Sequence, residues 1–209
     1  MTTTVYALQS VLGTTDCQFV GDSSRQVGWS PDNEACSLWQ QWTSLAARID
    51  IDWNTGTEHC PDPPSSLGQI TIERLSPANA VVRRFGLLDG YRRMMTVVVL
   101  LAALGSGAET RGDLAGAARI REKYLINKFA RHPAHRWRLA PAPPDAIGWD
   151  DLMTGRAESI PLRRPADESV SRWYSIAPEH DVSAATYRLE RAIVGWTTVE
   201  EHLVEDTVA

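Results

Sequence analysis

Five consecutive residues, Asp89 to Arg93, have the types and spacing expected of an anion site at the start of a helix. Asp89 is expected to cap a helix that begins at Tyr91, and Gly90 allows close backbone approach or a positive φ. Arg92 and Arg93 then lie in the first turn, where the helix dipole disfavours each cation by about 0.3–1 kcal/mol. A bound phosphate would reverse that penalty. The alternative is that Asp89 is only a cap and the arginines pair with nearby carboxylates.

A second group of charged residues lies between 111 and 138, where basic and aromatic side chains are interleaved. A basic helix with this pattern can follow a nucleic-acid backbone. The same pattern also describes a solvated helix face whose aromatic rings point inward. The residues expected to contact nucleic acid are Arg119, Lys123, Lys128 and Arg131.

The composition of the chain and the absence of common motifs limit the classes of protein to which it can belong. The chain has 209 residues, of which 43% are hydrophobic and 22% charged, as in ordinary globular domains. The longest apolar run, Met94–Leu104, is shorter than the ~18 residues of a membrane span, and no secretory signal is visible, so we expect no membrane partner. Three cysteines without CxxC spacing fit the reducing cytoplasm. No P-loop, GxGxxG or Ser/His/Asp arrangement is found.

Histidines near the basic segment raise the question of a metal. His132 and His135, taken together with His59 and Cys60, match no zinc-binding spacing. We therefore expect no metal site.

Charge is segregated along the chain although the net charge is only −5. Residues 67–138 hold 13 Lys and Arg against five Asp and Glu, whereas both flanking segments are acidic. Such a basic middle is expected of an anion site in an acidic protein. The alternative is that the middle segment pairs internally with the two ends.

Hydrophobic periodicity predicts an α+β fold, with strands that come mainly before the helices. The pattern indicates a mixed domain over residues 1–110 and a helical extension over residues 111–209. A β-hairpin is expected where two strand-like runs flank Ser76–Asn79. The predicted strands cover residues 18–20, 68–74 and 80–88, and the predicted helices cover residues 5–12, 31–49, 91–104, 113–130, 149–153, 167–175 and 183–205.

The segment Leu87-Leu-Asp-Gly-Tyr-Arg-Arg-Met-Met-Thr96, which leads into an apolar helix, resembles a family signature. The N-terminal domain of GmrSD-type restriction proteins shows Ile-Asp-Gly-Gln-Gln-Arg-Leu-Thr-Thr before such a helix. Three further stretches resemble that family in the expected order. They are Phe19–Trp29, which retains Arg25 and Trp29, then Ser66–Ile72 and Arg121–Asn127.

The resemblance implies a small fold like that of ParB and sulfiredoxin, and a site that binds and hydrolyses nucleoside triphosphates with magnesium. It implies catalytic roles for Asp89 and Arg93. It also implies a role in restriction of foreign or phage DNA, in which a separate HNH nuclease subunit cuts the DNA. The ligand-binding residues that it implies are Gly90, Tyr91, Arg92, Thr96 and Arg25.

The chain departs from the family signature at the residues that matter for hydrolysis. Tyr91 and Arg92 replace the two glutamines, and Met95 replaces one threonine. A glutamine amide orients an attacking water, whereas tyrosine and arginine hold an anion but orient water poorly. The resemblance therefore implies binding of a phosphorylated ligand, a nucleotide or DNA, with weak or lost hydrolysis. The alternatives are a non-catalytic interaction module, or a ParB-like fold adapted as a small-molecule enzyme of specialised metabolism.

Overall fold

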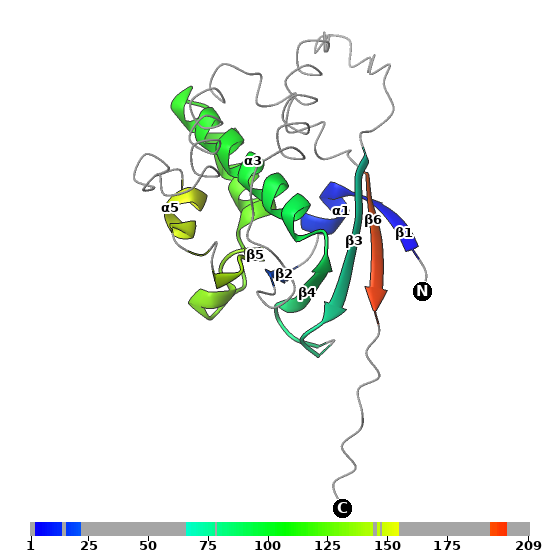
Figure 1. The fold of residues 1–209 in the computed structure, drawn as a ribbon. Helices are drawn as coiled ribbons and strands as arrows, with labels where there is room; N and C mark the ends of the chain where they lie inside the picture. The colour runs from blue at the N-terminus through cyan, green and yellow to red at the C-terminus, as the bar shows by residue number, and fades with distance from the viewer. Residues whose placement is uncertain are drawn as a thin grey trace, which may run out of the picture.

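The structure, a computed structural model, describes residues 3–13, 16–21, 66–77, 79–143, 146, 148–154 and 193–199 (Figure 1). These residues form an α+β fold, in which a mixed sheet packs against helices. The predicted helices over residues 31–49 and 167–175, and Arg25, lie outside the described residues.

The sheet has six strands in the order β1-β6-β3-β4-β2-β5. β3 and β4 form the predicted antiparallel hairpin, so that prediction is confirmed. β2 lies parallel to β4 and to β5, while β6 is parallel to β3 and antiparallel to β1. The strands are β1 (Thr3–Ala7), β2 (Cys17–Gly21), β3 (Ser66–Arg74), β4 (Arg83–Asp89), β5 (Leu139–Ala140) and β6 (Ile193–Val199).

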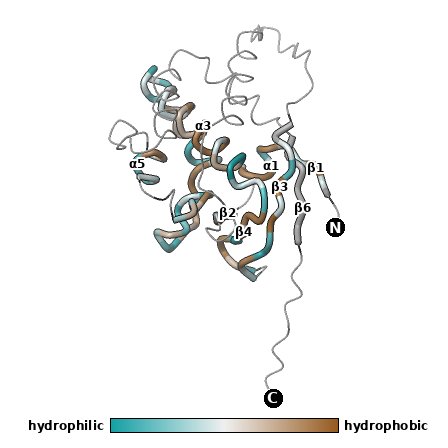
Figure 2. The backbone as a smooth tube through the Cα atoms, in the orientation of Figure 1, coloured by the Kyte–Doolittle hydropathy of each residue, from teal (hydrophilic) through white to brown (hydrophobic). Residues whose placement is uncertain are grey.

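The helix α3 (Tyr91–Thr110) forms the centre of the core (Figure 1). A single residue, Gly90, separates it from the end of β4, and every residue from Met94 to Gly105 is buried. A helix that is apolar on all sides must be covered on all sides. Figure 2 shows hydrophobic stretches along α3 and along β3 and β4. By length and composition α3 could cross a membrane. However, 78% of its 18-residue apolar segment is buried inside the protein, as in a core helix.

α3 is longer than predicted, because the sequence indicated an end at Gly105 whereas the helix continues to Thr110. Gly105 is buried against Ile120, whose Cγ2 would lie 3.6 Å from a Cβ at that position. A Cβ there would make an ordinary van der Waals contact, so Gly105 is an internal residue of α3 and does not end the helix. The helix ends before Gly112, which has a φ of +80°.

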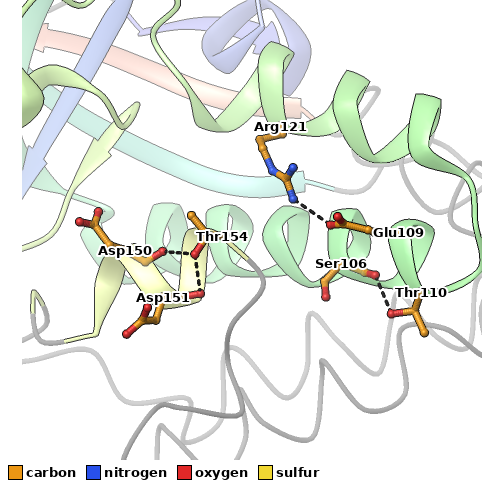
Figure 3. Close-up of polar contacts among 7 residues, drawn as sticks. All are labelled: Ser106, Glu109, Thr110, Arg121, Asp150, Asp151 and Thr154. Atoms are coloured by element: carbon orange, nitrogen blue, oxygen red, sulfur yellow. Dashed lines mark hydrogen bonds and ion pairs between the residues drawn. The ribbon is translucent and has the colours of Figure 1, made fainter.

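The predicted helix over residues 113–130 is wrong beyond Leu125. α4 (Leu114–Ile120) runs into a π-helical turn, η1 (Arg121–Leu125), and the chain then extends so that Ile126 pairs with Trp137. Figure 3 shows an ion pair that fixes η1 to the end of α3, in which Arg121 Nη2 lies 3.0 Å from Glu109 Oε2.

The predicted helix over residues 183–205 is wrong over residues 193–199, which form β6, and the rest of that prediction lies outside the described residues. Five of those seven residues are β-branched, and such side chains favour strands over helices. The apolar spacing that indicated a helix is compatible with either structure over so short a run. β5 and β6 follow residue 110 in sequence, and both join the sheet that the preceding residues form.

The remaining elements are short. The predicted strand at residues 18–20 is confirmed as β2, and the predicted helix at 149–153 is confirmed as α5 (Trp149–Met153), which packs on α3. The predicted helix over 5–12 is half right: the β-prone residues 3–7 form β1, and only α1 (Leu8–Leu12) is helical. A 3₁₀ turn, η2, covers Pro133–His135.

Candidate functional site

Gly90, and not Asp89, is the N-cap residue of α3, so the predicted capping role of Asp89 is wrong. Gly90 has a φ of +85°, and a Cβ there would lie 2.4 Å from Ile70 Cγ2. The chain therefore turns from β4 into α3 through a conformation and a space that only glycine fits. Asp89 is instead the last residue of β4, opposite Thr71, and its side chain is 67% exposed.

Arg93 lies at the predicted site but is also bound to the protein. Its Nη1 donates a hydrogen bond to the Gln69 carbonyl over 2.6 Å and lies 3.9 Å from Asp89 Oδ2. Its guanidinium also lies over Gly68, where φ is +79°. Arg93 thus joins the start of α3 to β3, and a third of its side chain remains exposed. Arg92, which precedes Arg93 in the sequence, is exposed.

Three residues that the sequence placed among the ligand contacts are buried, namely Gly90 and the side chains of Tyr91 and Thr96. Tyr91 is 1% exposed, and its hydroxyl accepts a hydrogen bond from the Ala142 N–H over 2.9 Å. Thr96 is 3% exposed, and its hydroxyl donates to the Arg92 carbonyl one turn earlier. Among the predicted site residues that the structure describes at the start of α3, Asp89, Arg92 and Arg93 are therefore the ones that reach the surface.

The basic segment contributes to an open cleft of about 370 Å³. The cleft joins parts of the chain more than 100 residues apart, since Gly13 and Asp16 face it as well as α4 and η1. Its walls hold two more cations than carboxylates. The charged lining residues are Arg119, Lys123, Lys128, Arg138, Asp16 and Glu122.

Three of the four residues predicted to contact nucleic acid therefore share one cleft. The fourth, Arg131, is exposed and does not line it. Sequence reasoning did not assign Arg138 or Phe129 to a site, although both belong to the basic and aromatic segment that it singled out. Nothing in the sequence marks Gly13 and Asp16 as part of this cleft, because only the tertiary structure brings the end of α1 next to η1.

Hydrogen bonds hold the cleft residues in place. The Arg138 N–H donates to the Leu125 carbonyl, and the Arg138 carbonyl accepts from the Phe19 N–H. Lys128 and Phe129 lie in a turn closed by the Ala130 N–H and the Asn127 carbonyl. Lys128 also pairs with Glu122 across the cleft lining.

His132 and His135 lie together, with their ring centroids 5.6 Å apart. Within the described residues no group of three or more His, Cys, Asp or Glu side chains is placed to hold a metal ion. His59 and Cys60 lie outside those residues.

Stability should fall slightly as the pH drops below about 6.5, because burial lowers the pKa of His135, as do the charges of Arg84 and His132. The unfolded chain then binds more protons than the folded chain, so this contribution is complete above 6.5 and is lost as the pH falls through the lowered value. Thermal melts between about pH 7.5 and 5 should show a shallower loss for His135→Gln. An identical slope in both proteins would contradict this assignment.

A scan against protein-family models and a search of the curated proteins both find no match to this chain.

Proposed function

We propose that the protein is a diverged GmrSD-like domain that binds a phosphorylated ligand, foremost a nucleoside triphosphate, at the start of α3. The single observation that supports this most is the electrostatics of that helix start. α3 is a 20-residue helix with no side-chain cap and no acidic residue in its first turn, where Arg92 and Arg93 lie instead. An anion there would interact favourably with the helix dipole and with both guanidinium groups.

The topology gives further support. β4 and β2 are parallel neighbours, and Gly21 at the end of β2 packs on Tyr91 at the start of α3. In sheets of parallel strands, ligands bind outside the carboxyl ends of the strands, next to the following helix. A ParB-like or sulfiredoxin-like arrangement is part of this proposal.

Binding without efficient hydrolysis is the activity we propose. Tyr91 stands where the family has a glutamine, and its hydroxyl is buried on the Ala142 N–H, away from any attacking water. Asp89 has an exposed carboxylate beside the first turn and suits a magnesium ion that arrives with the nucleotide, since carboxylates together with substrate phosphates form typical Mg²⁺ sites. In this proposal the protein acts in the cytoplasm with a separate HNH nuclease subunit in DNA restriction.

Calorimetric titration with ATP, GTP and CTP, with and without magnesium, tests the proposal. We expect saturable binding of at least one nucleotide and little release of phosphate. If none of them binds at millimolar concentration, the proposal fails, and a non-catalytic interaction module becomes the better hypothesis. Turnover of a small molecule without nucleotide binding would instead favour the metabolic enzyme.

Replacing Arg93 with alanine should weaken nucleotide binding about 10- to 100-fold, the scale of a lost charge-assisted hydrogen bond. It should also lower the free energy of unfolding by about 1 kcal/mol, because the Gln69 carbonyl loses its partner in a partly exposed place. Calorimetry and urea unfolding measure the two effects. Arg74→Ala, at the far end of β3, is the control for lost charge. Unchanged nucleotide affinity with reduced stability would make Arg93 purely structural.

A further inference from the structure

The basic cleft is separate from the start of α3. Asp16, which lines the cleft, precedes β2, whereas Gly21 at the other end of β2 contacts Tyr91. A strand of this length spans about 15 Å. No residue from Asp89 to Arg93 lines the cleft. A ligand in the cleft would therefore occupy a different place from the nucleotide proposed at α3.

Two of the cationic residues that line the cleft, Arg138 and Lys123, are held in place by the surrounding structure. Arg138 is 5% exposed, and its backbone is bonded both to the end of η1 and to β2. Lys123 lies on the π-helical turn with its Nζ 5.1 Å from the centroid of the Tyr124 ring. An arginine fixed in a wall favours an anionic group such as phosphate, which can accept two parallel hydrogen bonds from a guanidinium.

An exposed aromatic ring completes the site. Phe129 is 64% exposed although it is a large hydrophobic residue, and it lines the same cleft as the cations. A ring beside fixed positive charges is the combination that binds a base and its phosphate together, because any base can stack on an aromatic face. The volume of about 370 Å³ lies in the range of small-molecule sites and does not accommodate a duplex.

We infer that this cleft binds a single nucleotide unit, with the phosphate on Lys123, Arg119 and Arg138 and the base stacked on Phe129. The unit is either a free nucleotide or one nucleotide of a single strand. Glu122 and Asp16 oppose binding, because both carboxylates are part of the lining, and Glu122 also pairs with Lys128.

Three probes at low salt test the inference on the full chain: inorganic pyrophosphate, ADP, and a labelled oligothymidylate of about eight nucleotides. Calorimetry measures the first two, and fluorescence anisotropy measures the third. We expect Lys123→Gln to weaken all three by about tenfold. Phe129→Leu should weaken ADP and the oligothymidylate by a similar factor but leave pyrophosphate unchanged.

Glu122→Gln is the sharpest variant, because it should tighten all three probes by about three- to fivefold, and damage to the fold cannot produce that result. Arg131→Gln removes the same kind of charge outside the cleft and should change nothing. Much tighter binding of the oligothymidylate than of ADP identifies a strand as the source of the unit, and the reverse identifies a free nucleotide.

The inference is overturned if no probe binds at millimolar concentration, or if Lys123→Gln, Phe129→Leu and Glu122→Gln all leave binding unchanged. It is also overturned if duplex DNA binds as tightly as the oligothymidylate and independently of Phe129. If the site at α3 also exists, ADP titrations contain two phases, and Arg93→Ala removes one while Lys123→Gln weakens the other. If only the α3 proposal fails, a single phase remains that depends on Lys123 and not on Arg93.

Discussion

Replacing Gly90 with alanine should lower the free energy of unfolding by about 3 kcal/mol, enough to remove much of the stability of a marginal domain. Two costs combine. A non-glycine residue at a φ of +85° costs about 1–2 kcal/mol. The new Cβ would also lie 2.4 Å from Ile70 Cγ2. Ile70 is a β3 residue that is only 2% exposed, so its side chain has little room to move away.

Gly112→Ala is the matched control, and urea unfolding is the measurement. Gly112 has nearly the same φ, +80°, but a Cβ there would meet no atom within 4 Å. The Gly112→Ala variant should therefore lose only the free energy that a positive φ costs alanine, about 1 kcal/mol. Equal losses at the two glycines would show that the contact with Ile70 is relieved and that backbone conformation alone fixes this turn.

Replacing Gln18 with leucine should lower the free energy of unfolding by about 2–3 kcal/mol. Gln18 is 1% exposed, and its Nε2 donates to the carbonyls of Ala134 and Trp137 over 2.7 and 3.1 Å. Leucine keeps the volume but leaves both carbonyls without this donor, and a buried polar group without a partner is costly. Its Oε1 also accepts from Arg84 Nε.

The control for this prediction is Gln9→Leu on α1, where the glutamine is half-buried and the change should cost less than about 0.5 kcal/mol. A second readout follows from position, since Gln18 anchors the residues just before Arg138 in the basic cleft. Gln18→Leu should therefore also weaken pyrophosphate binding. A variant as stable as the wild type would contradict the structural role of Gln18.

Features that depend on neighbouring residues could be predicted from the sequence. The hairpin of β3 and β4, the start of the following helix at Tyr91 and the short helix α5 all follow from local alternation, turn residues and apolar spacing. The same local reasoning singled out Asp89 to Arg93, and it selected three of the cations that share the basic cleft.

Local reasoning was wrong where a distant contact overrides a local preference. Gly105 was expected to end α3, but it is a buried residue inside the helix, where it faces Ile120. Asp89 was expected to cap α3, but hairpin pairing holds it in β4 and leaves Gly90 as the cap. Residues 193–199 have helix-like spacing, but they form β6 between β1 and β3.

The sequence by itself determined the α+β class, the apolar central helix and the residue types able to hold an anion, because these depend on composition and on periods of two and 3.6 residues. Only the tertiary structure decided which residues share a site. It buried Tyr91 and Thr96, bound Arg93 to β3, and joined Gly13 and Asp16 to cations more than 100 residues away. Such contacts are set by packing of the whole core, which brings residues together irrespective of their separation along the chain.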